Sequence, residues 1–507
     1  MILSRENLDA IAKTGIDVPQ AATFELPEKV LQFGTGVLLR GLPDYFINKA
    51  NNQGVFNGRV VVVKSTGTST VEFDQQDSLY TLCIRGIENG QPVSQNIISS
   101  AISRVIAADR DWKSILSLAE SPSLQLVVSN TTEVGIQLVE ESIQLQPPTS
   151  FPAKLLAVLH HRYHFFKGSA TAGLVIVATE LIPDNGKRLK EIILELSNFN
   201  QLGDEFLSWL ESSNHFCNSL VDRIVPGKPD ANSLAALQEE LGYTDHLLSM
   251  SEPYRLWAIE GNEQVAAILS FAKADPGVVI AEDIEIYREL KVRLLNGTHT
   301  LSSGIAFLSA IDTVKNAMQN AQVKSYIETL MGEEIAPSIP YAVTEQQASA
   351  FADTVKDRFA NPSIEHLWLN ITFQYSMKMK IRILPLLLNY VRLFNQVPAY
   401  IAFGFAAYLR FMKIEHTADG KYVGSYQGRD YQVTDDSAPY FDEKIRQDPQ
   451  DYPISVLKDA DFWKTDLTLC SGFVETVVEK YQEIESAGIE RALSALQSAK
   501  LEQDHTI

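Results

Sequence analysis

The chain has 507 residues, 45% of them hydrophobic, and a formal net charge of −20 at pH 7. This length exceeds one ordinary hydrophobic core, so we expect two large domains or three smaller ones. The acidic balance argues against binding to a nucleic-acid backbone, and no apolar run is long enough to span a membrane.

The N-terminus lacks the basic region and following apolar stretch of an export signal, so we expect a cytoplasmic protein. The first predicted unit runs from Glu28 to Arg40 as a short apolar strand, a Gly-x-Gly turn and a helix that ends near Asn51. The β-branched run from Gly58 to Lys64 then predicts a buried parallel strand. Together these segments predict a βαβ unit.

The α/β alternation continues over residues 124–129 and 173–179, which read as strands, with a helix over residues 154–166 between them. Helical periods dominate from about residue 286 to about residue 412, and a β-like patch follows at residues 420–428. We therefore expect an α/β dinucleotide-binding domain over residues 1–283 and a mostly helical domain over residues 284–507.

The turn at Gly34 and Gly36 lets the backbone approach a pyrophosphate at the start of a helix, although such a turn can also be purely structural. The usual third glycine is replaced by Leu39. The acidic ribose ligand is replaced by Lys64, which leaves NADP open beside NAD. The candidate cofactor-binding residues here are Val30, Leu31, Gln32, Phe33, Gly34, Thr35, Gly36, Val37, Leu38, Leu39, Arg40, Gly41 and Lys64.

Polar groups also follow two later strands. Thr132 and Glu133 come after residues 124–129, and we expect them either at the cofactor edge of the sheet or in a helix cap. Asn185 follows residues 173–179, where Asn-Gly ordinarily marks a turn. The pair Asp222 and Arg223 lies between apolar residues, as in a buried ion pair or a polar contribution to the cleft.

The segment Lys291-Val-Arg-Leu-Leu-Asn296-Gly-Thr-His299 combines three side-chain types that suit hydride-transfer chemistry. On an α-helix, with about 100° per residue, all three can face one cleft. Lys291 could act as general acid/base if burial or neighbouring Arg293 lowers its pKa. Asn296 could donate to an alkoxide-like oxygen and His299 could hold a neighbouring hydroxyl. A surface lysine, a capping asparagine and a core histidine are the structural alternative.

Three cations, Lys378, Lys380 and Arg382, alternate along the helical half of an acidic chain. They could bind a substrate carboxylate or form a solvated helix face. The three cysteines fit no metal-binding spacing, and the nine histidines show no ligand-spaced cluster, so we expect no metal.

Taken in order, these segments resemble the mannitol dehydrogenase family of polyol-specific long-chain dehydrogenases from about Val30 to about Arg410, with Lys-x4-Asn-x2-His as the signature. The further matches are Gly34 to Arg40, Thr132-Glu133, Val221 to Ile224, Glu252-Pro253 before Trp257, and Arg358 to Pro362. The resemblance implies a Rossmann-type N-terminal domain, a helical C-terminal domain, NAD(H) and no metal. It also implies that Lys291 is the general acid/base, with Asn296 and His299 as polar partners of the reacting carbonyl.

One departure points to a branch of this family. Mannitol-type members carry Cys-Asp-Asn where this chain has Thr179-Glu180-Leu181, so Asn185 is the nearest candidate for the missing amide donor. The Glu-Leu-Ile-x-x-Asn-Gly form, residues 216–224 and residues 378–385 resemble the tagaturonate reductase branch, whose anionic hexuronate would pair with the cations.

We therefore expect NAD(H)-dependent reversible reduction of tagaturonate to altronate. The alternatives are a mannitol 2-dehydrogenase, a fructuronate reductase and, more distantly, a dinucleotide-sensing protein without catalysis. The sequence leaves open the hexuronate epimer and the oligomeric state.

Overall fold

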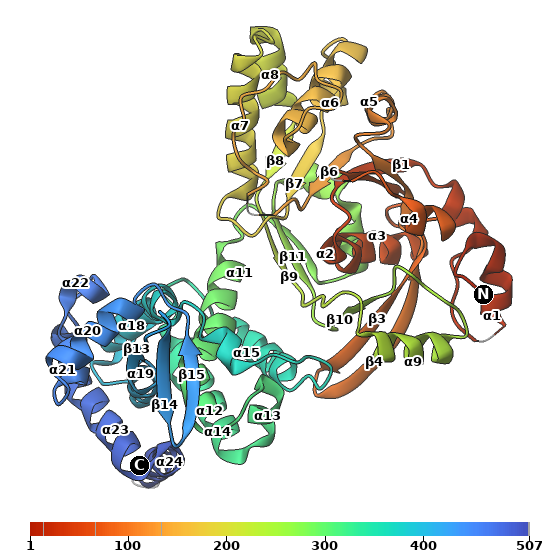
Figure 1. Ribbon diagram of the computed structural model, residues 1–507. Helices are drawn as coiled ribbons and strands as arrows, with labels where there is room; N and C mark the ends of the chain where they lie inside the picture. The colour runs from red at the N-terminus through yellow and green to blue at the C-terminus, as the bar shows by residue number, and fades with distance from the viewer. Residues whose placement is uncertain (14, 66, 133, 505–507) are drawn as a thin grey trace. The chain divides into compact units, whose positions relative to one another are not determined.

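A computed structural model describes residues 1–13, 15–65, 67–132 and 134–504 (Figure 1). The chain divides into two compact units. The N-terminal unit comprises Met1–Gly86 and Pro92–Ile284, and the C-terminal unit comprises Ile87–Gln91 and Glu285–Ile507. Among the described residues, no helix is long and apolar enough to cross a bilayer.

The N-terminal unit is built on a six-stranded sheet with the strand order β5-β2-β1-β6-β7-β8, in which every neighbouring pair is parallel. Its strands are β1 (Glu28–Phe33), β2 (Arg59–Lys64), β5 (Ile102–Ala107), β6 (Leu126–Ser129), β7 (Val175–Ala178) and β8 (His215–Cys217). The four strands predicted from apolar runs, β1, β2, β6 and β7, are therefore confirmed. Because β1 lies between β2 and β6, the turn after β1 is at the centre of the carboxyl edge of the sheet.

Both faces of this sheet are buried, which explains the near-continuous apolar runs of its strands. Val61 and Val63 contribute to one core, and Val60 and Val62 contribute to another on the opposite face. The associated helices are α2 (Val37–Gly41), α3 (Pro43–Asn52), α4 (Val71–Gln75), α5 (Trp112–Ala119), α6 (Phe151–Phe165), α7 (Asn185–Phe199) and α8 (Asp204–Ser213).

Two smaller sheets complete the N-terminal unit. One has the order β10-β3-β4 and the other β12-β11-β9. Their strands are β3 (Tyr80–Glu88), β4 (Gln91–Ser99), β9 (Ser219–Asp222), β10 (Ser249–Ser251), β11 (Leu256–Glu260) and β12 (Val278–Ala281). The remaining α-helices are α1 (Leu8–Ala12), α9 (Ala231–Leu241) and α10 (Glu263–Ile268).

The C-terminal unit is mostly helical, as predicted, and Figure 1 shows its helices in green to blue. Three of its segments are π-helical: η5 (Lys291–Gly297), η6 (Leu330–Ile335) and η8 (Met379–Ile383). Its first α-helices are α11 (Glu285–Leu290), α12 (Thr298–Leu308), α13 (Val314–Gln319), α14 (Ala321–Thr329), α15 (Glu345–Phe359), α16 (Trp368–Ile371), α17 (Tyr375–Lys378), α18 (Leu384–Phe394) and α19 (Ala399–Phe411). The element η5 packs against η8, which joins two segments far apart in sequence.

The β-like patch predicted near residue 420 lies in an antiparallel sheet of β13 (Ile414–His416), β14 (Tyr422–Tyr426) and β15 (Arg429–Val433). The chain then continues as α20 (Ala438–Gln447), α21 (Tyr452–Leu457), α22 (Ala460–Trp463), α23 (Phe473–Ala487) and α24 (Ile489–Asp504). One contiguous core unites these elements with the preceding helices.

Candidate active site

The turn after β1 has the form that a bound dinucleotide requires. Gly34 has φ +128°, and a Cβ there would lie 2.8 Å from the carbonyl oxygen of Asn130. A Cβ on Gly36 would meet nothing within 4 Å, so the backbone is open on that side. Leu39, which stands where a third glycine is usual, is fully buried in the core beneath the sheet. These residues fit a pyrophosphate close to the backbone at Gly36.

The residues predicted to bind the cofactor fall into two groups, one buried and one partly exposed. Val30, Leu31, Gln32 and Phe33 are fully buried in β1, and Leu39, Arg40 and Gly41 are buried at the other end. The Arg40 guanidinium donates to the carbonyl of Leu247, and Tyr80 donates to the Arg40 carbonyl. The side chains at both ends therefore contribute to the fold, and their contact with the cofactor stays a prediction. Gly34, Thr35, Gly36, Val37 and Leu38 stay partly exposed and remain candidates.

A buried carboxylate organises the loop after β6. Glu180 accepts hydrogen bonds from Ser129 Oγ (3.0 Å), Thr131 N (2.9 Å) and Thr131 Oγ1 (3.0 Å). Burial raises the pKa of Glu180, while these donors oppose the rise. Thr132 follows with φ +102° and an exposed side chain, and Glu133 lies outside the described residues. The loop begins at the carboxyl edge beside the Gly34 turn, since the backbone amide of Asn130 donates to the carbonyl of Phe33 at 3.1 Å.

Lys64 ends β2 at the same edge of the sheet. Its Nζ donates to the carbonyl of Ser69 at 2.7 Å. The lysine therefore helps to hold the following loop in place. This contact does not indicate whether the cofactor carries a ribose hydroxyl, as NAD does, or a 2′-phosphate, as NADP does.

The side chain of Asn185 is held by hydrogen bonds within the fold. Its Nδ2 donates to the carbonyls of Glu180 and Ser219, both at 3.0 Å. Its Oδ1 accepts from the backbone amides of Gly186 and Ser219, both at 2.9 Å. Because both amide hydrogens are engaged and the side chain is buried, Asn185 has none left for a substrate oxygen. Leu181, at the departure from the mannitol-type pattern, is exposed to solvent.

Asp222 and Arg223 are also buried. Arg223 donates to the carbonyl of Glu252 (2.9 Å) and to that of Gly41 (2.6 Å), and it lies over the ring of Tyr45. Burial lowers the pKa of Arg223 to about 10. These contacts favour the structural alternative for Arg223, because it joins β9 to the chain that follows the dinucleotide turn.

The predicted catalytic segment is π-helical rather than α-helical. Lys291 begins η5, and Asn296 lies near its end. The i→i+5 hydrogen bonding of a π-helix brings residues five positions apart towards one face, and π-helical turns are frequent at functional sites. Arg293, which we expected to act on Lys291, instead pairs with Glu289 and donates to the carbonyls of residues 381 and 382. It thereby fixes η5 to η8.

His299 lies in α12 among aromatic rings, with 9% of its surface exposed. Its imidazole stacks on Phe359, with 4.1 Å between ring centroids, and meets His366 and Trp368 edge-on. Burial and then nearby His366, Arg358, Arg382 and Lys378 lower the pKa of His299 well below its usual value. The imidazole is therefore neutral at pH 7. Its Nε2 has no hydrogen-bond partner among the described residues, so it suits a ligand hydroxyl.

Two of the three predicted cations lie near His299. Arg382 donates to Thr300 Oγ1 at 3.2 Å, and Lys378 donates to the carbonyl of Ile371 at 2.7 Å. Burial lowers the pKa of Lys378 to about 8 and that of Arg382 to about 10. No ion pair is formed by either side chain within the described part of the chain. Their positive charge is thus available to an anion.

Lys380 faces away from Lys378 and Arg382. Its Nζ lies 3.5 Å from the centroid of the Phe462 ring, in a cation–π contact with α22. Residues four positions apart share a helix face, whereas those two apart do not. Lys378 and Arg382 therefore share a side, and Lys380 points away from them.

The structure adds Arg358 and His366 to the surroundings of His299. Arg358 is buried at the end of α15, next to Phe359. Burial lowers the pKa of His366, and the charges of Lys378 and Arg358 lower it further. Arg358 lies in a segment whose family likeness the sequence showed without a role, whereas nothing in the local pattern marked His366. We use the term His299 cluster for His299, Arg358, His366, Lys378 and Arg382.

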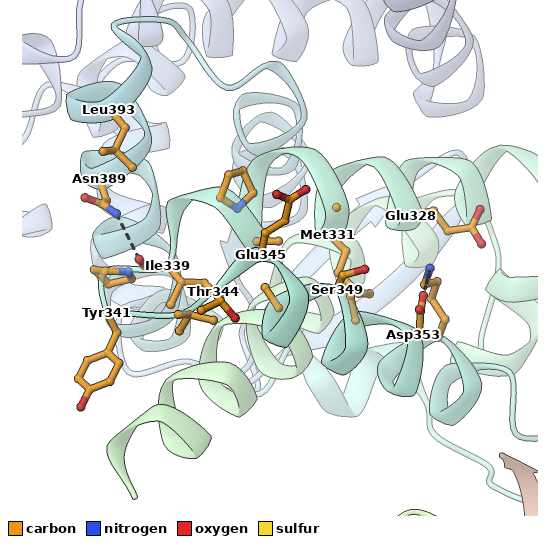
Figure 2. A pocket seen from close by; sticks show the side chains of 18 of the residues that line it. Glu328, Met331, Ile339, Tyr341, Thr344, Glu345, Ser349, Asp353, Asn389 and Leu393 are labelled. Carbon is orange, nitrogen blue, oxygen red and sulfur yellow. Dashed lines mark hydrogen bonds and ion pairs between the residues drawn. The ribbon is translucent and has the colours of Figure 1, made fainter. Parts of the chain in front are cut away.

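One cavity of the C-terminal unit is lined by other residues. It has a volume of about 770 Å³ and runs along α15, α18 and the segment around Ile339 (Figure 2). Asn389 donates to the carbonyl of Ile339 at its wall. None of Lys291, Asn296 and His299 lines it. Buried polar chemistry, rather than cavity size, therefore identifies the candidate site.

Comparison with known proteins places this geometry in a family. The mannitol dehydrogenase Rossmann domain matches residues 28–273, and the mannitol dehydrogenase C-terminal domain matches residues 283–485. The chain belongs to the mannitol dehydrogenase family. Among curated relatives, the altronate oxidoreductase of Halalkalibacterium halodurans is 38% identical, with 93% of this chain and 94% of the relative covered. That of Bacillus subtilis is 36% identical, with 92% and 95% covered.

Two solved structures share the fold. A D-sorbitol dehydrogenase in substrate-free form matches with a TM-score of 0.75 at 19% identity, covering 97% of this chain and all of that one. The Pseudomonas fluorescens mannitol 2-dehydrogenase in ternary complex with NAD and D-mannitol matches with a TM-score of 0.66 at 20% identity, covering 98% and 100%. The expected fold class, a Rossmann-type domain followed by a mostly helical domain, is confirmed by these matches together with the parallel sheet.

Proposed function

We propose that the protein is an altronate oxidoreductase that reversibly reduces tagaturonate to altronate with NADH. The curated relatives with this activity match the chain over nearly its whole length. The structural observation that carries the substrate class is the His299 cluster, where Lys378 and Arg382 add positive charge beside a neutral imidazole. An uncharged hexitol gives these half-buried cations no counter-charge, whereas a hexuronate carboxylate does.

The N-terminal unit supplies a site that fits the dinucleotide. Gly36 leaves the backbone open where a pyrophosphate would approach, and Thr35 to Leu38 are partly exposed around it. The loop held by Glu180 adds Thr132 at the same edge. When bound, NADH supplies the hydride that reduces the ketone carbon. The relatives and the NAD complex of mannitol 2-dehydrogenase support NAD as the cofactor, and Lys64 keeps NADP as a comparison for the assay.

The side chains of the C-terminal unit handle the oxygen atoms and the proton. Lys291 donates a proton to the oxygen of the reduced carbonyl and recovers it from the alcohol in the reverse direction. Asn296 donates a hydrogen bond to the same oxygen as negative charge develops on it. His299, neutral and with a free Nε2, orients a neighbouring hydroxyl. Lys378 and Arg382 bind the carboxylate.

The test is the loss of NADH absorbance at 340 nm with tagaturonate, fructuronate and fructose offered separately to the purified protein. Rapid oxidation with tagaturonate and little with fructose is the expected result. Fructose reduction at a comparable kcat/KM would contradict the carboxylate site and favour a mannitol 2-dehydrogenase. Faster oxidation with fructuronate than with tagaturonate would identify fructuronate as the substrate. No oxidation of NADH with any of the three would indicate a protein that only senses the dinucleotide.

A further inference from the structure

Two histidines of the N-terminal unit converge outside the site described above. His160 and His164 lie on successive turns of α6, and their Nε2 atoms are 2.9 Å apart. This four-residue spacing is present in the sequence, although we expected no ligand-spaced histidines there. His164 is exposed and His160 is half-buried, so the point where the nitrogens meet is open to solvent.

Neighbouring rings hold the pair in place. His160 meets Phe206 of α8 edge-on, with centroids 5.1 Å apart, and Tyr163 meets His164 at 5.3 Å. The two imidazoles are themselves perpendicular, at 4.3 Å. The donors are thus arranged before a ligand arrives, which reduces the entropy cost of binding.

The distance between the nitrogens selects the kind of ligand. Two metal–nitrogen bonds of about 2.05 Å to atoms this far apart enclose an angle of roughly 90°, whereas a tetrahedral ion needs nitrogens roughly 3.3 Å apart. A right angle is the cis angle of square-planar and octahedral ions, and imidazole suits Ni²⁺ and Cu²⁺. We infer that His160 and His164 form a two-histidine chelate for such a divalent ion on the outer surface of α6.

The rest of the coordination comes from solvent. Among the described residues, no group of three or more histidine, cysteine, aspartate or glutamate side chains could hold a metal ion. The site is therefore bidentate, and water fills the other positions. A bound ion replaces the hydrogen bond between the two rings and joins one turn of α6 to the next. It stabilises the folded state by an amount that grows with the logarithm of the ion concentration divided by Kd, because the unfolded chain does not hold the two nitrogens together.

The chain offers a matched control in His161. It is adjacent to His160, but its Nε2 pairs with Glu120 at 2.9 Å, on a different side of the helix. Replacing His161 removes one imidazole from the same helical turn without touching the chelate. His160→Phe removes the donor nitrogen and keeps a ring against Phe206, while His164→Ala changes an exposed position.

The experiment titrates untagged full-length protein with NiCl₂ in an isothermal calorimeter and follows the unfolding temperature in parallel. We expect one ion per chain, a rise in unfolding temperature with Ni²⁺, and an affinity weakened at least about tenfold by His160→Phe or by His164→Ala. His161→Ala should retain the wild-type affinity. The inference is overturned if the wild type does not bind Ni²⁺ at millimolar concentration. It is equally overturned if the two chelate variants bind like the wild type, or if His161→Ala is weakened as much as they are.

Discussion

The phenyl ring of Phe359 lies flat against the imidazole of His299, with 4.1 Å between the centroids and 13° between the planes. This contact sets the direction of the His299 nitrogens, because the imidazole has ring neighbours and no hydrogen bond from its Nε2 among the described residues. The orientation of the side chain proposed to bind the substrate thus depends on apolar packing from the end of α15.

Replacing Phe359 with leucine should therefore lower kcat more than the loss of stability explains. We expect a loss of about 1 kcal/mol in the free energy of unfolding and a fall of about tenfold in kcat, since small misplacements of positioning groups are costly. Phe307→Leu is the control, because Phe307 is similarly buried and meets Phe411 and Tyr431 edge-on instead. Equal kcat losses in the two variants would remove the positioning role of Phe359.

The two glycines of the dinucleotide turn should respond differently to alanine. Gly36→Ala adds a methyl group where the protein leaves open space, so the fold should be retained while NADH affinity falls by about tenfold or more. Gly34→Ala should destabilise the N-terminal unit itself, because φ is +128° and the methyl would lie 2.8 Å from the Asn130 carbonyl oxygen. Fluorescence titration with NADH and thermal unfolding separate the two effects. Unchanged NADH affinity in Gly36→Ala would place the pyrophosphate elsewhere.

The sequence predicted the sheet well because its strands are buried on both faces. Every residue from Val60 to Val63 is β-branched, as expected for a strand that is buried on both faces of the sheet. The contacts within the candidate site were harder to predict from the sequence. The engagement of both Asn185 amide hydrogens depends on Ser219, more than thirty residues away. Likewise, nothing local to His366 indicates that it meets His299 edge-on.

The geometry of η5 also escaped prediction. Apolar periodicity near 3.6 residues does not distinguish an α-helix from one with a π-helical turn, because the difference lies in one inserted hydrogen-bond step. The orientation of Lys380 could have been inferred, since residues two apart on a helix diverge. Its contact with Phe462, however, depends on how α22 packs.

Replacing Lys291 with methionine should lower kcat by about two to four orders of magnitude, because a positioned general acid contributes that much to proton transfer. NADH binding should be unaffected, since the dinucleotide turn lies in the other unit. Stopped-flow turnover with tagaturonate and fluorescence titration with NADH measure the two quantities. A kcat within a few-fold of the wild type would exclude Lys291 as the proton donor.

Lys378→Met and Lys380→Met form a matched pair on one segment. We expect KM for tagaturonate to rise about tenfold or more in Lys378→Met, since hydrogen bonds to charged groups contribute about 1.5–3 kcal/mol. Lys380→Met should leave KM unchanged, because that ammonium lies over Phe462. Initial rates across a range of tagaturonate concentrations decide between them. A larger effect at Lys380 would reverse the assignment of the carboxylate site.

The titration of Lys378 predicts that kcat/KM declines at alkaline pH. Burial and then Arg382 lower the pKa of Lys378 to about 8. Its side chain is therefore charged below about pH 8 and loses its positive charge as the pH rises through this value. For tagaturonate, kcat/KM should therefore fall above about pH 8 in the wild type. Lys378→Arg keeps a charge throughout this range, and the limb should move upwards in that variant. A limb at the same pH in both proteins would belong to another group.

Glu334 should make the stability of the protein depend on pH without affecting the chemistry. Its carboxylate accepts hydrogen bonds from the backbone amides of Tyr400 (2.9 Å) and Ile401 (2.7 Å) at the start of α19. Burial nevertheless raises the pKa of Glu334 to about 7 from 4.5.

Because the folded state binds this proton more tightly than the unfolded state, the contribution of Glu334 to stability is present below pH 4.5 and is lost as the pH rises through about 7. The loss amounts to roughly 3 kcal/mol at most, at about 1.4 kcal/mol per pH unit. Glu334→Gln cannot ionise, so its free energy of unfolding should vary less between pH 5 and pH 7 than that of the wild type. Urea unfolding at these two pH values measures the difference, and parallel pH profiles would mean that Glu334 is already ionised at pH 5.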